Sequence, residues 1–352
     1  MGAERGCTSQ NSNMNKIVKI ALLLSGLGLF SCASRQQAGQ THFPKADGRY
    51  DSEFPVESVS DELAYLSTTV RKLNCLVFYR TYSFDAGNPL EKTSLTQEQI
   101  NTYASGSEVT NESVSGTATM VYYDGKQLGM LTCAHVVDFT DSLFTYYTDG
   151  SLQSLSVKLN QQNFVSGLPD GEDIELIASD DKKDIALLRK VLSSHEQRPA
   201  VLKYPIGNTK DLDWGTVVYT MGYPLGKLMV TRAIVSKPEN GNKGMFLTDA
   251  LFNQGISGSP VLALRDGVPN FEWVGMASSS SAQSIHYLSP GDDNPQEITT
   301  SGTYSGEVYL DHRKAIHYGV TFSVRIEDVV KFLSQNKKLL QEKGFHTDRF
   351  FK

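Results

Sequence analysis

Short apolar segments separated by turn residues run through most of the chain from residue 74 onward. They are rich in β-branched and aromatic residues, and Asp-Gly and Asn-Gly pairs between them favour tight turns. A polar linker near 193–213 divides twelve expected strands into two sets of six: 74–84, 116–123, 127–137, 143–148, 174–179, 184–191, 215–223, 227–236, 244–252, 259–264, 271–279 and 317–324. The pattern therefore predicts an all-β protein of two six-stranded antiparallel barrels.

Helical spacing of apolar residues flanks these strands. Residues 61–73 show it after Ser60, which is a good N-cap, and residues 331–343 show it with lysines on the opposite face. The second segment predicts a C-terminal amphipathic helix. Two long polar stretches, 85–115 and 278–315, carry no pattern of either kind, and we expect both to be inserted loops.

The first part of the chain has the features of a targeting segment. After Met14, Lys16 and Lys19 precede a short apolar run that ends at Cys32. A charged start, an apolar run too short to span a bilayer well and a boundary of small residues are typical of a secretory signal. The letters LFSC resemble a bacterial lipobox, whose cysteine becomes the lipidated first residue; an ordinary signal cut near Ala33 is the alternative. We therefore predict a lipid anchor at Cys32, in the bacterial cell envelope on the periplasmic face.

Composition narrows the class of protein. Of the 352 residues, 39% are hydrophobic and 20% charged, as in a globular chain, and the net charge of −6 offers no basic footprint for nucleic acid. We expect a leader and signal peptide at 1–32, followed by a flexible tether at 33–59. The N-terminal barrel is expected at 60–195, the C-terminal barrel at 196–324, and a helix with a tail at 325–352.

The cysteines and histidines do not suggest a metal centre. Cys7 and Cys32 fall in the leader and the anchor, while Cys75 and Cys133 fit either a disulfide or two buried thiols. No spacing of Cys and His suits a metal ion, so we expect neither a metal nor a cofactor.

Three motifs carry the residue types that nucleophilic catalysis needs. His135 lies in TCAHVV at the end of an apolar strand, Asp184 heads the strand DIALLR, and Ser257 lies between glycines in GISGSP. A serine hydroxyl becomes a good nucleophile when an imidazole takes its proton and a carboxylate orients that imidazole. Gly255 lets its own amide and that of Ser257 point at one spot, an oxyanion hole, and Gly258 leaves room for a substrate backbone. We therefore predict a catalytic triad of His135, Asp184 and Ser257.

Five segments in this order resemble the trypsin-like serine proteases of chymotrypsin fold, and within them the HtrA/DegP branch. They are TCAHVVD, SDDKKDIALLRK, VVYTMGYPLGKLMVTRAIVS, FLTDALFNQGISGSPVL and HYGVTFSVRIEDVVKFL, and the resemblance runs from about residue 116 to residue 333. It implies a serine endopeptidase that cleaves proteins or peptides through an acyl-enzyme, in quality control or processing of envelope proteins. It also implies a homo-oligomer, a trimer as in relatives.

The same resemblance implies where substrate specificity lies. The primary pocket would be lined by Leu251, Phe252 and Asn253, with the first two as an apolar floor that favours small or medium aliphatic residues before the scissile bond. The insertion 278–315 would hang between the strands that usually wall this pocket. We expect it to act as a lid or selectivity loop, with a disordered surface loop as the alternative.

The chain departs from the family's pattern at several positions. Ile256 stands where Asn or Asp is usual, so a salt bridge from a newly cut N-terminus to this position is excluded. Ser259 replaces the commoner Gly, as in glutamyl-endopeptidase-like members, and Cys133 stands where small or amide side chains are common. HtrA proteases normally carry PDZ domains after the protease domain, whereas only about a helix is expected here.

Other interpretations exist for the same residues. Ser257 alone would suit a tight turn and His135 a core histidine, and Asp173, Asp180 or Asp181 could replace Asp184 as the acid. An α/β hydrolase is disfavoured because GISGS lacks the last glycine of G-x-S-x-G and a strand follows the serine. The second hypothesis is a catalytically silent or latent protease fold that binds unfolded chains or a partner. The presence of all three triad residues argues against it.

Overall fold

The computed structural model describes residues 46–350 apart from residues 94, 169–173, 194–197, 240–243 and 291–307. The expected leader, signal peptide and Cys32 anchor lie outside this part of the chain. Within it, none of the helices has the length and apolar character that a membrane crossing requires.

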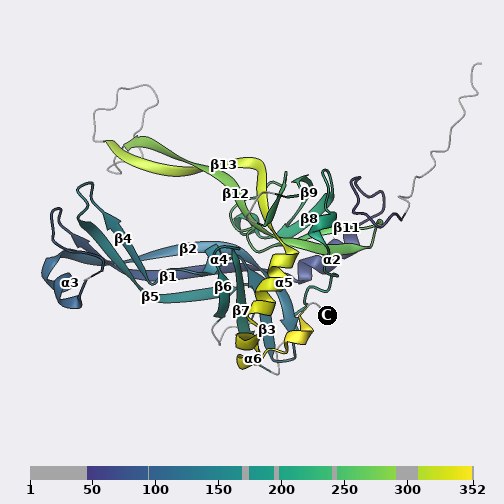
Figure 1. Cartoon of the computed structure of the whole chain (residues 1–352), viewed down its shortest axis with the longest axis horizontal. Helices are drawn as coiled ribbons and strands as arrows, with labels where there is room; N and C mark the ends of the chain where they lie inside the picture. The colour runs from purple at the N-terminus through teal and green to yellow at the C-terminus, as the bar shows by residue number, and fades with distance from the viewer. Residues whose placement is uncertain are drawn as a thin grey trace, which may run out of the picture. The chain divides into compact units, whose positions relative to one another are not determined.

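Seven strands of the N-terminal half form one antiparallel sheet in the order β4-β5-β1-β2-β3-β7-β6 (Figure 1). They are β1 (Val70–Phe84), β2 (Ala104–Tyr123), β3 (Gln127–Thr132), β4 (Ser142–Tyr146), β5 (Leu152–Val165), β6 (Glu175–Asp180) and β7 (Ile185–Val191). β4 and β6 are edge strands, so this half is an open sheet where a closed six-stranded barrel was expected. The additional strand is β5, most of whose residues are half-buried or exposed and carry little apolar signal.

The polar stretch 85–115 is not a loop. It contains α3 (Gln97–Tyr103), which starts with a capping box between Thr96 and Gln99, and the outer half of β2, which pairs with β1. A small separate core supports this extension: Phe84, Leu90, Ile100, Leu152 and Leu155. The expectation was wrong because the outer half of β2 is exposed or half-buried throughout, so no alternation of apolar and polar residues marks the strand.

The helix before β1 is also shorter than expected. α2 (Ser60–Thr68) has Val59 at its N-cap position, and no side chain caps it. It ends before residue 73 because Val70 and Leu73 are fully buried as part of β1. Burial in the sheet outweighs the helical spacing of this segment.

Six strands of the C-terminal half close into an antiparallel barrel in the order β10-β13-β12-β11-β8-β9, as expected. They are β8 (Val217–Gly222), β9 (Met229–Lys237), β10 (Met245–Thr248), β11 (Pro260–Leu264), β12 (Phe271–Pro290) and β13 (Val308–Arg325). β12 and β13 continue beyond the barrel as a two-stranded ribbon that stays paired as far as Pro290 and Val308 (Figure 1). The described part of the expected loop 278–315 is therefore an extension of these strands.

The expected C-terminal helix is present. The chain ends in α5 (Ile326–Gln335), α6 (Lys337–Glu342) and η4 (Thr347–Arg349). The rings of Phe345 and Phe350 pack on Tyr122 of β2, with centroids 5.0 and 4.9 Å away. Lys343 Nζ pairs with Glu175 Oε1 of β6 at 2.5 Å. The tail that follows the C-terminal barrel thus packs against the N-terminal sheet.

The first described residues belong to the stretch expected to be a flexible tether, and they are bound to the C-terminal barrel. The guanidinium of Arg265 lies 4.0 Å from the centre of the Tyr50 ring. The Asp51 N–H donates to Leu264 O at 2.9 Å, and the Val217 N–H donates to Asp51 O at 2.8 Å. This segment therefore bridges β11 and the start of β8.

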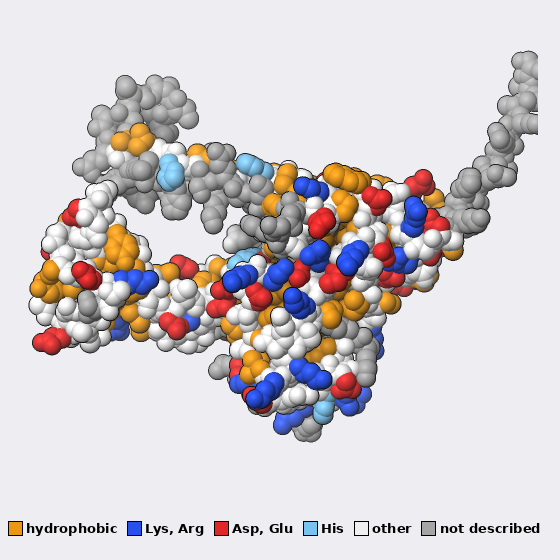
Figure 2. All heavy atoms as spheres, in the orientation of Figure 1, with side chains coloured by type: hydrophobic (Ala, Val, Ile, Leu, Met, Phe, Trp, Pro, Cys, Tyr) orange, Lys and Arg blue, Asp and Glu red, His pale blue; other side chains and the backbone are white. Residues whose placement is uncertain are grey.

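Charged side chains are spread over the surface of the described part. Figure 2 shows Lys and Arg interspersed with Asp and Glu over both halves on this face.

Candidate active site

His135 lies on α4 (Ala134–Val137), a one-turn helix that follows β3. The strand expected to carry it ends earlier, at Thr132. Val136 and Val137 are fully buried, whereas the His135 side chain is 45% exposed. Burial of its neighbours thus anchors the turn and leaves the imidazole at the surface.

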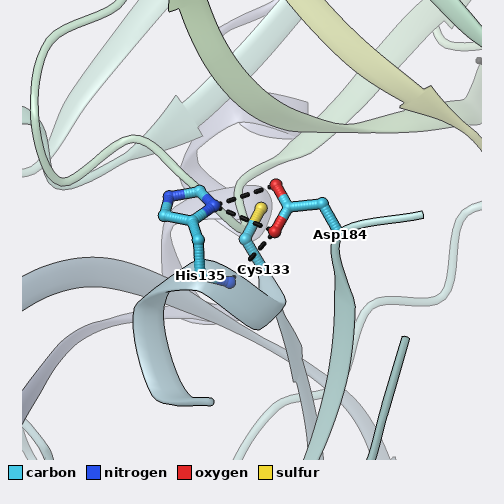
Figure 3. A group of neighbouring side chains, drawn as sticks. All are labelled: Cys133, His135 and Asp184. Atoms are coloured by element: carbon cyan, nitrogen blue, oxygen red, sulfur yellow. Dashed lines mark hydrogen bonds and ion pairs between the residues drawn. The ribbon is translucent and has the colours of Figure 1, made fainter. Parts of the chain in front are cut away.

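Asp184 occupies the turn between β6 and β7. Its φ of 58° is left-handed, a conformation that Asp tolerates better than most side chains. Both carboxylate oxygens lie 2.9 Å from His135 Nδ1, and the backbone N–H of His135 donates to Oδ1 at 3.0 Å (Figure 3). Of the alternative acids, Asp180 caps this turn, Asp181 is exposed, and Asp173 lies outside the described residues.

The Asp184 carboxylate is ionised at neutral pH. Burial disfavours its charge, but the hydrogen bond and charge of His135, with the hydroxyl of Ser278, hold the pKa of Asp184 below its usual value. An ionised carboxylate only accepts hydrogen bonds, so His135 Nδ1 carries the proton that it donates to Asp184.

Ser257 lies in a tight loop between β10 and β11 that requires glycine on both sides. Gly255 and Gly258 have φ of +104° and +94°. A Cβ on Gly255 would lie 2.3 Å from Tyr223 O, and one on Gly258 would lie 2.1 Å from Thr117 O. The loop brings backbone so close to neighbouring carbonyls that no larger residue fits.

The three predicted residues meet in one hydrogen-bonded chain. Ser257 Oγ lies 3.0 Å from His135 Nε2, on the opposite side of the ring from Asp184. Because Nδ1 is protonated, Nε2 of the neutral ring holds the lone pair that accepts the serine proton. The arrangement can therefore generate an alkoxide-like nucleophile at Ser257.

The two amides expected to form the oxyanion hole are not used in hydrogen bonds to other described residues. Gln254 O accepts from Leu225 N–H at 2.8 Å. Since the C=O and N–H of a trans peptide point in opposite directions, the Gly255 N–H points away from the turn that carries Leu225. Within the described part, the amides of Gly255 and Ser257 donate no hydrogen bond. Ile256 is only 3% exposed in the barrel core, so apolar packing holds this loop.

Ser278 is a site residue that the sequence did not reveal. Its hydroxyl donates to Asp184 Oδ2 at 2.5 Å. Its carbonyl oxygen lies 2.8 Å from Ser257 Oγ and is an alternative acceptor, beside His135 Nε2, for the one hydroxyl proton of Ser257. It is the first of four consecutive serines, and nothing in that run distinguishes it. A buried strand that leads directly into a polar run was the available signal.

The three residues expected in the primary pocket are separated. Phe252 is 2% exposed and packs in the barrel core, so it is not the expected floor, and Leu251 is 62% exposed. Asn253 is half-buried and accepts from the Tyr318 hydroxyl at 3.4 Å. The turn beside this loop continues into β9 with exposed apolar side chains: Leu225, Leu228, Met229 and Val230.

Cys133 lies beside the triad, with its sulfur and the ligand atoms of His135 and Asp184 within 4.8 Å of one another (Figure 3). Its thiol donates to Ala277 O at 3.2 Å. Complete burial and the charge of Asp184 raise the pKa of Cys133 far above its usual value, so the sulfur is a neutral thiol. A bonded thiol and an Nδ1 bound to a carboxylate form a poor ligand set for a metal.

The cysteines of the described part are both free thiols. Cys75 and Cys133 are both buried and unpaired with each other, so the disulfide alternative is not realised. Burial raises the pKa of Cys75 to about 11.

The fold and the site together define a class of protein. His135 and Asp184 come from an antiparallel sheet and Ser257 from a closed antiparallel barrel, the division found in serine peptidases of the chymotrypsin type. Residues 116–276 match the trypsin-like peptidase domain. The chain therefore carries a trypsin-like peptidase domain and is a serine endopeptidase. No curated protein matches the sequence.

Two solved protease structures are similar to the chain at low identity. The HtrA-type protease AlgW, as a serine-to-alanine variant with a decapeptide, is 17% identical over 82% of this chain and 68% of its own, with a TM-score of 0.44. The serine endoprotease from Yersinia pestis is 17% identical over 83% of this chain and 69% of its own, with a TM-score of 0.40.

Proposed function

We propose that the protein hydrolyses peptide bonds through an acyl-enzyme, with Ser257 as nucleophile, His135 as general base and Asp184 as the acid that orients it. The observation that carries the proposal is the hydrogen-bonded chain, in which His135 lies 2.9 Å from Asp184 and 3.0 Å from Ser257. Attack by Ser257 Oγ on the peptide carbonyl sends its proton to His135 Nε2. Asp184 stabilises the resulting imidazolium, which then protonates the leaving amine.

The oxyanion of the tetrahedral intermediate would be held by the amides of Gly255 and Ser257. Each such donor contributes about 3–4 kcal/mol to transition-state stabilisation. Water then attacks the acyl-enzyme with His135 again as the base, and this step releases the second product and restores Ser257.

The surroundings of Ser257 support an apolar residue before the scissile bond. Leu225, Leu251 and Tyr318 are 73%, 62% and 62% exposed beside the nucleophile loop, where they offer a binding surface for an aliphatic side chain. We infer that substrates are proteins or peptides cut after small or medium aliphatic residues. Cleavage of a peptide library, read by mass spectrometry, tests this preference.

We also propose that the protein acts in the cell envelope, lipid-anchored at Cys32 on the periplasmic face, as a homo-oligomer in processing or quality control of proteins. The lipobox-like LFSC and the apolar run before it support the anchor. Mass spectrometry of the mature N-terminus, with Cys32→Ala as the control, tests the anchor, and light scattering tests the oligomer.

A fluorophosphonate probe tests the triad directly, because it reacts with serines that an adjacent base activates. The purified protein is labelled beside Ser257→Ala and His135→Ala, and the modified peptide is identified by mass spectrometry. We expect labelling at Ser257 that is absent from both variants. A folded wild-type protein that takes up no label would instead indicate a protease fold used for binding.

A further inference from the structure

Thr117 of β2 makes three hydrogen bonds around the nucleophile loop. Its Oγ1 donates to Gly255 O at 2.7 Å and accepts from Tyr223 N–H at 3.0 Å. Its backbone N–H donates to Ser257 O at 2.8 Å. The side chain is fully buried, so none of these groups can exchange its partner for water. One threonine thus joins the two segments that border the oxyanion hole.

The Thr117 hydroxyl binds the nucleophile loop at Gly255, where no side chain restricts the backbone. Gly255 has no Cβ, so its φ of +104° is one of many values open to it, and both peptides beside it can rotate. The bond from Leu225 N–H fixes the carbonyl of the first peptide, and Thr117 Oγ1 fixes the carbonyl of the second. Among the described residues, Thr117 is the one side chain that bonds to Gly255 O or to Tyr223 N–H.

We propose that Thr117 is a positioning residue that keeps the oxyanion hole formed, an inference that rests on the proposed function of Ser257 and Gly255. Its hydroxyl ties the Gly255 carbonyl to the Tyr223 N–H and so limits rotation of the peptide that follows Gly255. The Leu225 N–H holds the preceding peptide, which carries the Gly255 N–H, and the two restraints together keep this N–H oriented without a substrate. The hydroxyl comes from the N-terminal sheet, while the loop and the turn belong to the C-terminal half. Formation of the hole therefore depends on contact between the two halves.

Loss of this hydroxyl should affect the transition state rather than substrate binding. A valine at position 117 keeps the shape of threonine but leaves Gly255 O and Tyr223 N–H buried without a partner, which is costly enough to displace the loop. Misplacement of an oxyanion donor weakens only interactions that form as charge develops on the substrate oxygen.

Thr119 provides a matched control within the same strand. It is also fully buried, and its Oγ1 donates to Gly258 O at 2.7 Å, just beyond the nucleophile. It bonds to neither Gly255 nor Tyr223. Thr119→Val therefore removes the same chemical group at the same burial but leaves the Gly255 carbonyl held. Its expected loss of stability is smaller, because one carbonyl loses its partner where Thr117→Val deprives two groups.

The experiment compares Thr117→Val, Thr117→Ser and Thr119→Val in the full-length chain. We measure kcat and KM for one peptide substrate, the affinity for a peptide aldehyde whose hemiacetal oxygen occupies the oxyanion hole, and Tm. Thr117→Val should lower kcat and aldehyde affinity together by about 10–100-fold, less than the 10²–10³ for removal of a donor, with KM unchanged. Thr117→Ser, which restores the hydroxyl, should recover most of both, and Thr119→Val should retain both.

Equal losses of kcat in Thr117→Val and Thr119→Val would overturn the inference, as would a Thr117→Val variant that raises KM at constant kcat. If Thr117→Val does not fold, Thr117→Ala and Thr119→Ala make the same comparison with a smaller side chain. Failure of the proposed function has a different signature, because the wild-type protein itself would then neither turn over peptide nor react with the fluorophosphonate.

Discussion

Replacement of Gly255 by alanine perturbs the oxyanion hole at a single backbone position. At φ +104° an alanine costs about 1–3 kcal/mol in backbone strain, and its Cβ would lie 2.3 Å from Tyr223 O. Real Cβ atoms essentially never approach within 3.0 Å of such an atom, so the loop must move by about 0.7 Å. Oxyanion donors act at about 2.7–3.1 Å, so this shift takes the Gly255 N–H out of range. We therefore expect kcat to fall by roughly 10²–10³.

Gly215 supplies the control for backbone strain. Its φ is +83°, and a Cβ added there would meet nothing within 4 Å, so Gly215→Ala carries strain without a clash. Peptide hydrolysis and thermal unfolding of both variants separate the two effects: both lose stability, and Gly255→Ala alone loses kcat. A Gly255→Ala enzyme that turns over substrate at the wild-type rate would show that the Gly255 amide is not an oxyanion donor.

Three further perturbations follow from the same site. Asp184→Asn should lower kcat by about 10⁴, since the tautomer of His135 is no longer set, with steady-state kinetics as the readout. The lowered pKa of Asp184 makes its ionised form stabilise the fold above the ordinary value of 3.8 and lose that effect as pH falls through the folded value. Urea unfolding of the wild type and Asp184→Asn should therefore differ at pH 7 and converge as the pH falls below 3.8 and through the folded pKa of Asp184. Ser278→Ala removes the 2.5 Å bond to Asp184, so the pKa of Asp184 should rise and kcat should fall by about tenfold. A pH–rate profile that matches the wild type would contradict this. The ribbon can be removed by replacing residues 283–315 with Asn-Gly, which joins the register partners Ala282 and Ile316. This variant should keep its fluorophosphonate labelling but change its peptide preference or turnover. Unchanged cleavage of the peptide library would show that the ribbon has no role in selectivity.

Strands whose side chains are mostly buried could be predicted from the sequence, whereas strands whose side chains are mostly exposed could not. β8 is buried over its whole length and β7 over most of it, so each appears as an apolar run. β5 and the outer half of β2 expose most side chains, and their polar sequence resembles a loop. Their pairing comes from neighbouring strands and from a small core formed by residues distant in sequence, which no local pattern encodes.

The triad was predictable for a different reason. His135, Asp184 and Ser257 each lie in a motif whose neighbours have fixed structural tasks, such as the buried valines after His135 and the glycines beside Ser257. The pocket could not be predicted in the same way. Whether the side chain of Leu251 or of Phe252 points into the protein depends on the loop conformation. Phe252 packs in the barrel core, and Leu251 is exposed.

The attachment of Tyr50 and Asp51 to the barrel has a mechanical consequence. The backbone bonds of Asp51 to Leu264 and Val217 attach this one residue to two neighbouring strands of the barrel, β11 and the start of β8. The contact between the Tyr50 ring and the Arg265 guanidinium is a second attachment to the barrel. Because these contacts precede α2 and β1 in the chain, a force that pulls on the chain upstream of Tyr50 meets the C-terminal barrel before it reaches α2.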